Sequence, residues 1–253
     1  MSDQLPAYVV VGATGGIGSA VCRQLAAKGA RLLLVARDDA KLNALADELR
    51  RTNPAGEYIA HPADATKSVE VDAAVAQAIR AFGTLAGATN LVGSILLKPA
   101  HATTDDEFDQ TLTLNTRTAF YVLRAAAKAM LTTGGSIVLA SSVAARIGLM
   151  NHEAIAAAKG AVTGLVLAAA ATYAPRNIRV NAVAPGLVDT PLAAKITGSE
   201  LAQKASAAMH PLGRIGKPDD VATAVAWLLD PATTWVTGQI LGIDGGLSAV
   251  RSK

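Results

Sequence analysis

Short apolar runs rich in β-branched residues alternate along the chain with longer stretches in which alanine and leucine recur at helical spacing. Apolar runs without polar alternation are typical of strands that are buried on both faces of a sheet. They predict strands at residues 8–11, 31–35, 58–61, 85–91, 136–140, 178–183 and 239–243.

The helical pattern fills most of the space between these runs. It predicts helices at residues 17–28, 39–51, 69–82, 106–130, 151–173 and 219–229. Repeated strand–helix–strand units predict an α/β fold, in which helices cover both faces of a parallel sheet. No repeat, low-complexity tract or linker divides the chain, so we expect a single domain.

Composition narrows the class of protein. Of the 253 residues, 51% are hydrophobic and 17% are charged, which is typical of a globular chain with a large core. The net charge is only +3 and the basic residues are scattered, which argues against a dedicated nucleic-acid surface. His61, His101 and His210 show no metal-ligand spacing, so we predict no metal site.

Cysteine usage and hydropathy bear on the compartment. The single cysteine, Cys22, excludes an intramolecular disulfide and fits a reducing compartment. The first residues lack the basic region and apolar core of a signal peptide. The most apolar stretch, 160–174, is short for a membrane span and is interrupted by polar and glycine residues. We therefore expect a cytoplasmic protein.

A glycine-rich turn, Val11–Gly18, lies between the first predicted strand and the first predicted helix. Glycines let the backbone approach a pyrophosphate closely, and the N-terminus of the following helix attracts its negative charge. This placement predicts a dinucleotide site.

The spacing Gly12-x-x-x-Gly16-Ile17-Gly18 resembles the signature of the short-chain dehydrogenase/reductase family, with Val11 where threonine is usual. Further matching segments follow at the family's expected distances, namely Asp64-Ala65, Asn90-Leu91-Val92-Gly93, 177–186 with Thr190, and 238–246. The resemblance spans about residues 7–247. It implies a Rossmann-type, doubly wound sheet in one domain over residues 1–253, hydride transfer between a carbonyl and an alcohol, and a lid over residues 185–218.

The resemblance also implies the nicotinamide cofactor and its contacts. Arg37, after Ala36, stands where family members that use NAD carry an acidic residue, and a guanidinium suits a 2′-phosphate. We therefore predict NADP(H) rather than NAD(H), although Asp38 and Asp39 offer Arg37 alternative partners. The implied cofactor-binding residues are Gly12, Thr14, Gly16, Ile17, Gly18, Arg37, Asp64, Ala65, Asn90, Lys159, Pro185, Gly186, Val188 and Thr190.

The implied catalytic group is incomplete. Family members combine a serine, an asparagine, a tyrosine and a lysine four residues after that tyrosine. Ser142, Asn115 and Lys159 match three of these positions, whereas Ile155 stands four residues before Lys159. All tyrosines lie elsewhere, at Tyr8, Tyr58, Tyr121 and Tyr173.

Three functions remain open at this point. In the first, the protein is an oxidoreductase with another proton donor, because general acid–base help contributes only about 10²–10⁴-fold to a rate. His152 is one candidate, because it stands three residues before Ile155 and seven before Lys159 and is expected on the same helix face. Lys159 itself or a water on Ser142 are others. In the second, the protein binds the cofactor without turnover. In the third, it catalyses an elimination or isomerisation.

Apolar residues surround the expected substrate site and predict a small, uncharged and fairly hydrophobic substrate; they are Ile95, Leu96, Leu97, Ile147, Leu149, Met150 and Leu192. The stretch 160–174 is apolar almost all round, which is typical of a helix that is buried on more than one side. We therefore predict a homo-oligomer, and the resemblance implies a tetramer.

Overall fold

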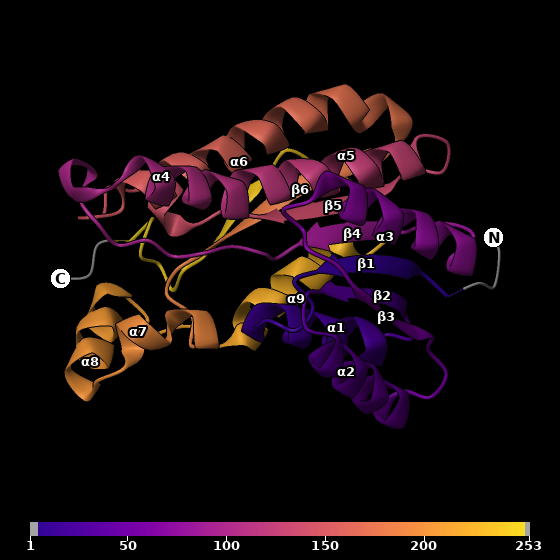
Figure 1. Cartoon of the computed structure of the whole chain (residues 1–253), viewed down its shortest axis with the longest axis horizontal. Coiled ribbons are helices and arrows are strands. Elements are labelled where there is room, and N and C mark those ends of the chain that lie inside the picture. The colour runs from indigo at the N-terminus through magenta and orange to yellow at the C-terminus, as the bar shows by residue number, and fades with distance from the viewer. Residues whose placement is uncertain (1–4, 251–253) are drawn as a thin grey trace.

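The computed structural model describes residues 5–250. Its centre is a parallel sheet with the strand order β3-β2-β1-β4-β5-β6-β7 (Figure 1). The strands are β1 (Ala7–Val11), β2 (Arg31–Ala36), β3 (Tyr58–Pro62), β4 (Gly87–Asn90), β5 (Gly135–Ala140), β6 (Ile178–Pro185) and β7 (Ile240–Ile243). The predicted α/β fold class, with its doubly wound parallel sheet, is confirmed.

Helices cover both faces of the sheet (Figure 1). One face carries α3 (Ser68–Phe82), α5 (Thr118–Met130) and α6 (Glu153–Tyr173). The other carries α1 (Gly16–Ala27), α2 (Asp39–Thr52) and α9 (Pro218–Leu229). Because side chains alternate along a strand, Val9 packs into the first layer and Val10 into the second, and both are fully buried.

The helix expected at 106–130 is divided. The structure has α4 (Asp105–Leu112), a π turn over Thr113–Arg117, and then α5. Within this turn the Asn115 side chain donates a hydrogen bond to the Thr111 carbonyl at 2.9 Å. Insertion of a side-chain group into the helical ladder is a recognised cause of such widened turns.

The helix expected from residue 151 begins two residues later, at Glu153. Asn151 has a left-handed backbone with φ of 62°, which an α-helix does not accept. His152 therefore precedes the helix, and its ring Nδ1 bonds the Met150 carbonyl oxygen at 2.7 Å. The expectation that His152 shares a helix face with Ile155 and Lys159 is wrong.

The segment 185–218 contains α7 (Ala194–Thr197) and α8 (Glu200–Met209), which project from the body of the molecule (Figure 1). Its base is fastened by a parallel bridge between Val188 and Gly216. A buried histidine, His210, adds a second connection, because its Nε2 accepts the Leu187 amide at 3.2 Å and its Nδ1 bonds the Ser206 carbonyl at 2.7 Å. The base of the segment is thus anchored at the end of β6.

Within the described residues, one helical stretch, Glu153–Arg176, is long and apolar enough to cross a membrane. It consists of α6 and the turn that follows it. Val162 and Val166 of α6 are fully buried in the core, and the helix packs against β6. Its hydropathy is therefore that of a core helix.

Candidate functional site

A cavity of about 830 Å³ opens at the carboxyl ends of β1, β2 and β4. The chain reverses its direction of winding between β1 and β4, and such switch points are where open α/β sheets bind ligands. Nine of the implied cofactor residues line it: Gly12, Thr14, Gly16, Ile17, Gly18, Arg37, Asp64, Ala65 and Thr190.

The glycine turn forms one wall of this cavity because side chains would not fit there. Gly12 has a left-handed φ of 86°, and a Cβ at this position would approach the Leu91 carbonyl carbon to 3.0 Å. A Cβ on Gly18 would collide with the Gly12 carbonyl oxygen, and one on Gly16 would press on Thr190. The backbone is therefore exposed to a ligand at close range.

The N-terminus of α1 faces the same turn. Its cap residue is Gly15, no side chain bonds the first N–H groups, and no acidic residue lies in the first turn. A helix start of this kind has free N–H donors and positive partial charge, and it suits a phosphate. These residues fit the pyrophosphate of a dinucleotide.

Two basic side chains line the outer part of the cavity. Arg37 is exposed there, and Lys41, on the first turns of α2, joins it. Asp38 is paired with Lys41. The Asp38 carboxylate accepts a hydrogen bond from the Lys41 amide at 3.0 Å, and the Lys41 Nζ lies 3.1 Å from the same carboxylate. Asp39 accepts a bond from the Asn43 side chain. Among residues 5–250, Arg37 forms no ion pair within 4.0 Å, so neither aspartate captures it.

Asp64 is held in a fixed orientation at the end of β3. Its Oδ1 accepts the Thr66 amide at 2.9 Å and the Thr66 hydroxyl at 2.8 Å, which lowers the pKa of the carboxyl group. Because both bonds use Oδ1, Oδ2 can accept a bond from the amino group of a ligand base. Ala65 beside it is buried and supplies an apolar wall.

The other implied cofactor residues lie behind or beyond this cavity. Asn90 is buried, and its Nδ2 donates to the Thr118 hydroxyl at 3.0 Å, so it braces the end of β4 against α5. Pro185, Gly186 and Val188 continue β6 toward the lid segment. The Gly186 amide donates to the Ile243 carbonyl at 3.0 Å, which ties this bend to β7.

Asn115 and Lys159 converge on the wall of the cavity at Gly93. A Cβ on Gly93 would lie 2.8 Å from Asn115 Oδ1 and 3.3 Å from Lys159 Nζ. Asn115 is held on three sides, since its Oδ1 accepts the Ser94 amide at 3.1 Å and its Nδ2 donates to the Ser94 hydroxyl and the Thr111 carbonyl. The π turn thus aims Asn115 at the start of the loop after β4.

Lys159 is a buried cation on α6, with 7% of its surface exposed. Its Nζ donates to the Ala140 carbonyl at the end of β5, at 2.8 Å. Burial lowers the pKa of this ammonium to about 8. Lys159 is therefore a stronger acid than an exposed lysine, although it keeps its proton at neutral pH.

Ser142 follows β5 and caps a short helical turn, where its hydroxyl oxygen accepts the Ala144 amide at 3.2 Å. Its hydroxyl hydrogen is left to donate to a ligand. The preceding Ser141 is buried and donates to the Lys159 carbonyl at 3.1 Å, so it fixes α6 against β5. Ile155 lies one helical turn before Lys159 and is 4% exposed.

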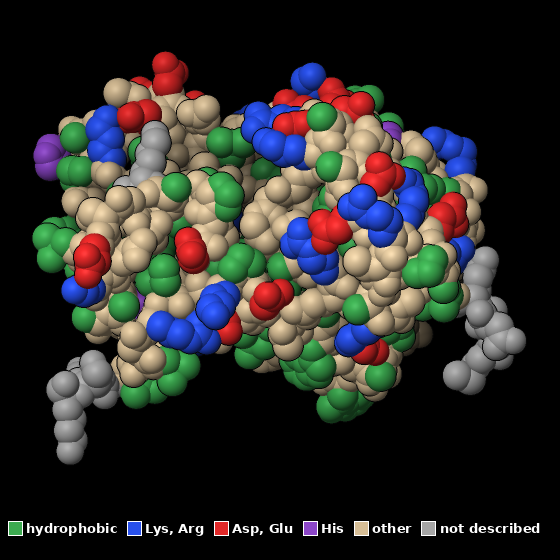
Figure 2. Space-filling model, turned by 90° about the horizontal axis from the view of Figure 1, so that it is seen from below, with side chains coloured by type: hydrophobic (Ala, Val, Ile, Leu, Met, Phe, Trp, Pro, Cys, Tyr) green, Lys and Arg blue, Asp and Glu red, His purple; other side chains and the backbone are tan. Residues whose placement is uncertain are grey.

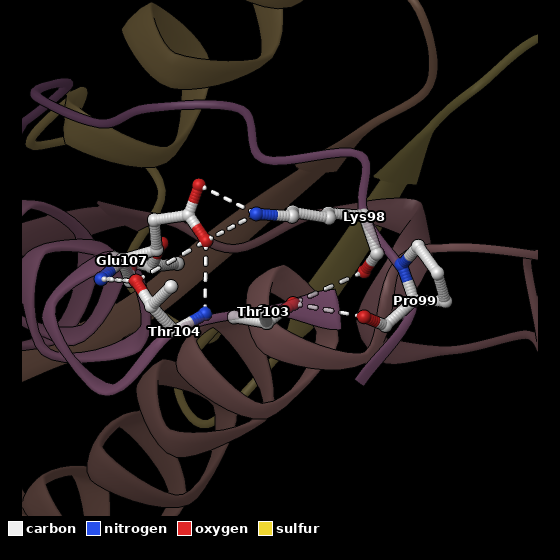
Figure 3. A network of polar contacts seen from close by, with 6 residues as sticks. Lys98, Pro99, Thr103, Thr104 and Glu107 are labelled. Atoms are coloured by element: carbon white, nitrogen blue, oxygen red, sulfur yellow. Dashed lines mark hydrogen bonds and ion pairs between the residues drawn. The ribbon is translucent and has the colours of Figure 1, made fainter. Parts of the chain in front are cut away.

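A polar network fixes the loop between β4 and α4 (Figure 3). Lys98 Nζ lies 2.7 and 3.0 Å from the two carboxylate oxygens of Glu107, which also accepts the Thr104 amide at 2.9 Å. The Lys98 amide donates to the Asn151 carbonyl at 2.8 Å. The loops that carry Ile95 and Met150 are thereby joined beside the site.

Lys41, the Lys98–Glu107 pair and the contacts of His210 were not predicted from the sequence. Lys41 stands four residues after Arg37, which was the available signal for a shared helix-start site. Lys98 and Glu107 lie on different elements, so no periodicity connects them.

No cluster of three potential metal ligands occurs in the described part of the chain. On the face shown in Figure 2, Lys and Arg alternate with Asp and Glu without forming a field of one sign.

Known proteins share both the sequence pattern and the fold. Residues 12–248 match the family model described as enoyl-(acyl carrier protein) reductase. Hydroxynaphthalene reductase-like protein Arp2 of Metarhizium brunneum is 36% identical over 251 residues, covering 94% of this chain and 93% of that protein. Galactitol 2-dehydrogenase (L-tagatose-forming) of Cereibacter sphaeroides is 38% identical over 242 residues, covering 94% and 92%.

Solved structures agree. A short-chain type dehydrogenase/reductase from Mycobacterium ulcerans superposes with a TM-score of 0.93 at 34% identity, covering 99% of this chain and 92% of that one. Levodione reductase superposes with a TM-score of 0.90 at 31% identity, covering 97% and 98%. The chain belongs to the short-chain dehydrogenase/reductase family, whose members are NAD(P)-dependent oxidoreductases of alcohol and carbonyl groups.

Proposed function

We propose that this protein is an NADP(H)-dependent oxidoreductase that interconverts a carbonyl and an alcohol on a small, fairly hydrophobic substrate. We further propose that Ile155 stands at the family's tyrosine position, which makes the active site atypical. The convergence of Asn115 and Lys159 at Gly93, on the wall of the dinucleotide-sized cavity, carries this proposal.

When bound, the nicotinamide supplies or accepts the hydride. The chain's own residues do the rest: the free hydroxyl hydrogen of Ser142 orients and polarises the substrate oxygen, while Lys159 brings a positive charge to the same end of the sheet. Ile155 contributes an apolar wall, which excludes water and strengthens the polar contacts around it.

Apolar side chains on the loops after β4, β5 and β6 support a hydrophobic substrate. Leu97, Met150 and Leu192 are all exposed at this end of the sheet. The segment 185–218 is the lid of the single domain in this proposal, because it extends from the end of β6 beside Thr190, which lines the cavity.

The preference for NADP(H) rests on Arg37, which lines the cavity and forms no ion pair within 4.0 Å among the described residues, whereas the nearby Lys41 is paired with Asp38. We expect Arg37→Ala to weaken NADPH binding about tenfold and NADH binding much less. The variant loses a charge-assisted contact to the 2′-phosphate worth about 1.4 kcal/mol, and NADH has no such phosphate. Fluorescence titration with both cofactors measures the difference. Equal losses for the two cofactors would contradict the phosphate assignment.

The function itself is tested by NADPH oxidation on a panel of apolar ketones and aldehydes, with the wild type and Ile155→Tyr side by side. We expect the wild type to turn over and the tyrosine to add less than about tenfold, because another proton donor is present. The folded state of the variant is checked by its melting temperature and its NADPH affinity.

A catalytically silent, cofactor-binding protein is the second candidate, favoured by the buried Ile155 beside an otherwise complete site. It predicts the opposite result, in which NADPH binds to both proteins but only Ile155→Tyr turns over.

We also propose a cytoplasmic homotetramer. The outer side of α6 exposes Leu167, and Phe120 is exposed on the neighbouring α5, so these two helices offer an apolar face to a second copy. We expect light scattering at micromolar concentration to give about four times the 25.7 kDa chain mass. A monomeric mass would contradict the assembly but leave the site unaffected.

A further inference from the structure

We propose that Lys159 itself is the proton donor and acceptor of this site, a role that deepens the proposed function and depends on it. The structure offers three side chains for the task on the elements that meet there: His152, Ser142 and Lys159. Their surroundings differ enough to separate them.

His152 and Ser142 are poorly suited. The His152 ring lies outside α6, is half-buried and bonds the Met150 carbonyl through Nδ1. Its position is set by the loop before α6 and not by the helix that carries Lys159. The Ser142 hydroxyl accepts a backbone amide and has no base bonded to it, and an unassisted hydroxyl is a weak acid.

Lys159 has the geometry and the protons. Its Nζ carries three hydrogens, and within residues 5–250 it has one hydrogen-bond partner, the Ala140 carbonyl. Two N–H groups therefore remain beside Gly93, which lines the cavity. Asn115 Oδ1 lies against the same glycine and fixes the polar side of this small space.

In the part of the chain that the structure describes, no carboxylate lies within 4.0 Å of this buried ammonium. Charged side chains do occur on the elements packed against α6, namely Asp105, Asp106, Glu107 and Asp109 on α4, Arg117 on the π turn, Arg124 and Lys128 on α5, Arg176 on the turn after α6, and Arg179 on β6. None of them contributes to the lowered pKa of Lys159, which has burial as its only cause. An unpaired buried cation is costly, and it is also a readier acid than an exposed lysine.

Proton transfer from Lys159 accompanies hydride addition to the carbonyl group of the substrate. The carbonyl carbon receives a hydride with its electron pair from a reduced nicotinamide dinucleotide, and the C=O π electrons move onto oxygen. That oxygen takes a proton from Lys159 Nζ, which becomes a neutral amine. The products are the alcohol and the oxidised dinucleotide, and solvent returns the proton to the amine before the next turnover.

The first test does not involve turnover. We expect NADPH affinity, read from cofactor fluorescence, to weaken in the wild type as the pH rises through about 8, because the ammonium loses its charge. In Lys159→Ala this part of the pH dependence is expected to vanish. The same pH dependence in both proteins would overturn the assignment of Lys159 as the titrating group.

The second test separates proton transfer from charge. We expect Lys159→Ala to lower kcat about 10²–10⁴-fold, and ethylamine, a protonated amine small enough for the vacated space, to restore activity at least tenfold. Tetramethylammonium supplies the charge without a transferable proton and is the control. Equal rescue by both ions, or no rescue in a variant that still folds and binds NADPH, would overturn the proposal.

The pH profile of the wild type identifies the donor directly. Carbonyl reduction needs the ammonium, so kcat/KM is expected to fall above about pH 8, and His152→Ala is expected to keep this inflection. Loss of the inflection in His152→Ala would identify His152 as the proton donor. That result would overturn the proposal for Lys159 but leave the proposed function intact. A wild type without turnover, beside an active Ile155→Tyr, would overturn the proposed function as well.

Discussion

Gly18→Ala is expected to remove most of the protein's affinity for NADPH, by at least about a hundredfold, and to lower its stability by roughly 3 kcal/mol. The added methyl group meets the carbonyl oxygen of Gly12 across the turn. Neither atom can move by rotating a side chain, so the turn must open. Opening it displaces the N–H groups of α1 from the place where they meet a pyrophosphate. Isothermal titration with NADPH and thermal unfolding measure the two losses.

Gly15→Ala is the matched control in the same turn. Gly15 has an ordinary φ of −73°, and its Cβ would lie 3.3 Å from the same Gly12 oxygen, so a shift of a few tenths of an ångström accommodates it. We expect a much smaller loss of affinity than in Gly18→Ala. Comparable losses in both variants would mean that any side chain in the turn obstructs the ligand, and that the contact between Gly18 and Gly12 is not decisive.

The fold was predictable because its signal is local and repeated. Strands β1, β2 and β5 are buried on both faces, and they appear in the sequence as uninterrupted apolar runs. The glycine turn was predictable for a similar reason, since its residues are neighbours in the chain. The two helices of segment 185–218 were not predicted, because α7 and α8 are short and polar and α8 contributes no buried residue to a core.

The site was predictable only where one element holds it. Asn115 could be singled out because asparagine is a poor helix former in a predicted helix, and the π turn around it supplies the physical reason. The position of His152 could not be read from spacing, because it depends on the left-handed backbone of Asn151. The environment of Lys159 depends on β4, β5 and the π turn together, so neither its burial nor its lowered pKa is visible in the sequence of α6.

Lys159→Met is expected to change the pH dependence of stability in the cofactor-free protein. Burial lowers the pKa of Lys159 from 10.5 to about 8. Between these values the unfolded chain binds the proton and the folded chain does not, so wild-type stability rises with pH across this window. Below about pH 8 both states are protonated, and the folded state carries the full cost of the buried charge. That cost is roughly 3 kcal/mol, and the methionine variant does not incur it.

The stability of Lys159→Met relative to the wild type is therefore expected to be greatest near neutral pH and to decrease by roughly 3 kcal/mol toward pH 10.5. Urea unfolding at a series of pH values measures this difference in the free energy of unfolding. The variant also loses the hydrogen bond to the Ala140 carbonyl, but this loss lowers its stability by the same amount at every pH and leaves the pH dependence unchanged. Lys128→Met, at an exposed lysine on α5, is the control for removing a charge without vacating a buried site. A pH-independent difference would show that Lys159 is solvated in solution. Its ammonium would then have the pKa of an exposed lysine, and the physical basis for its role as a proton donor would be lost.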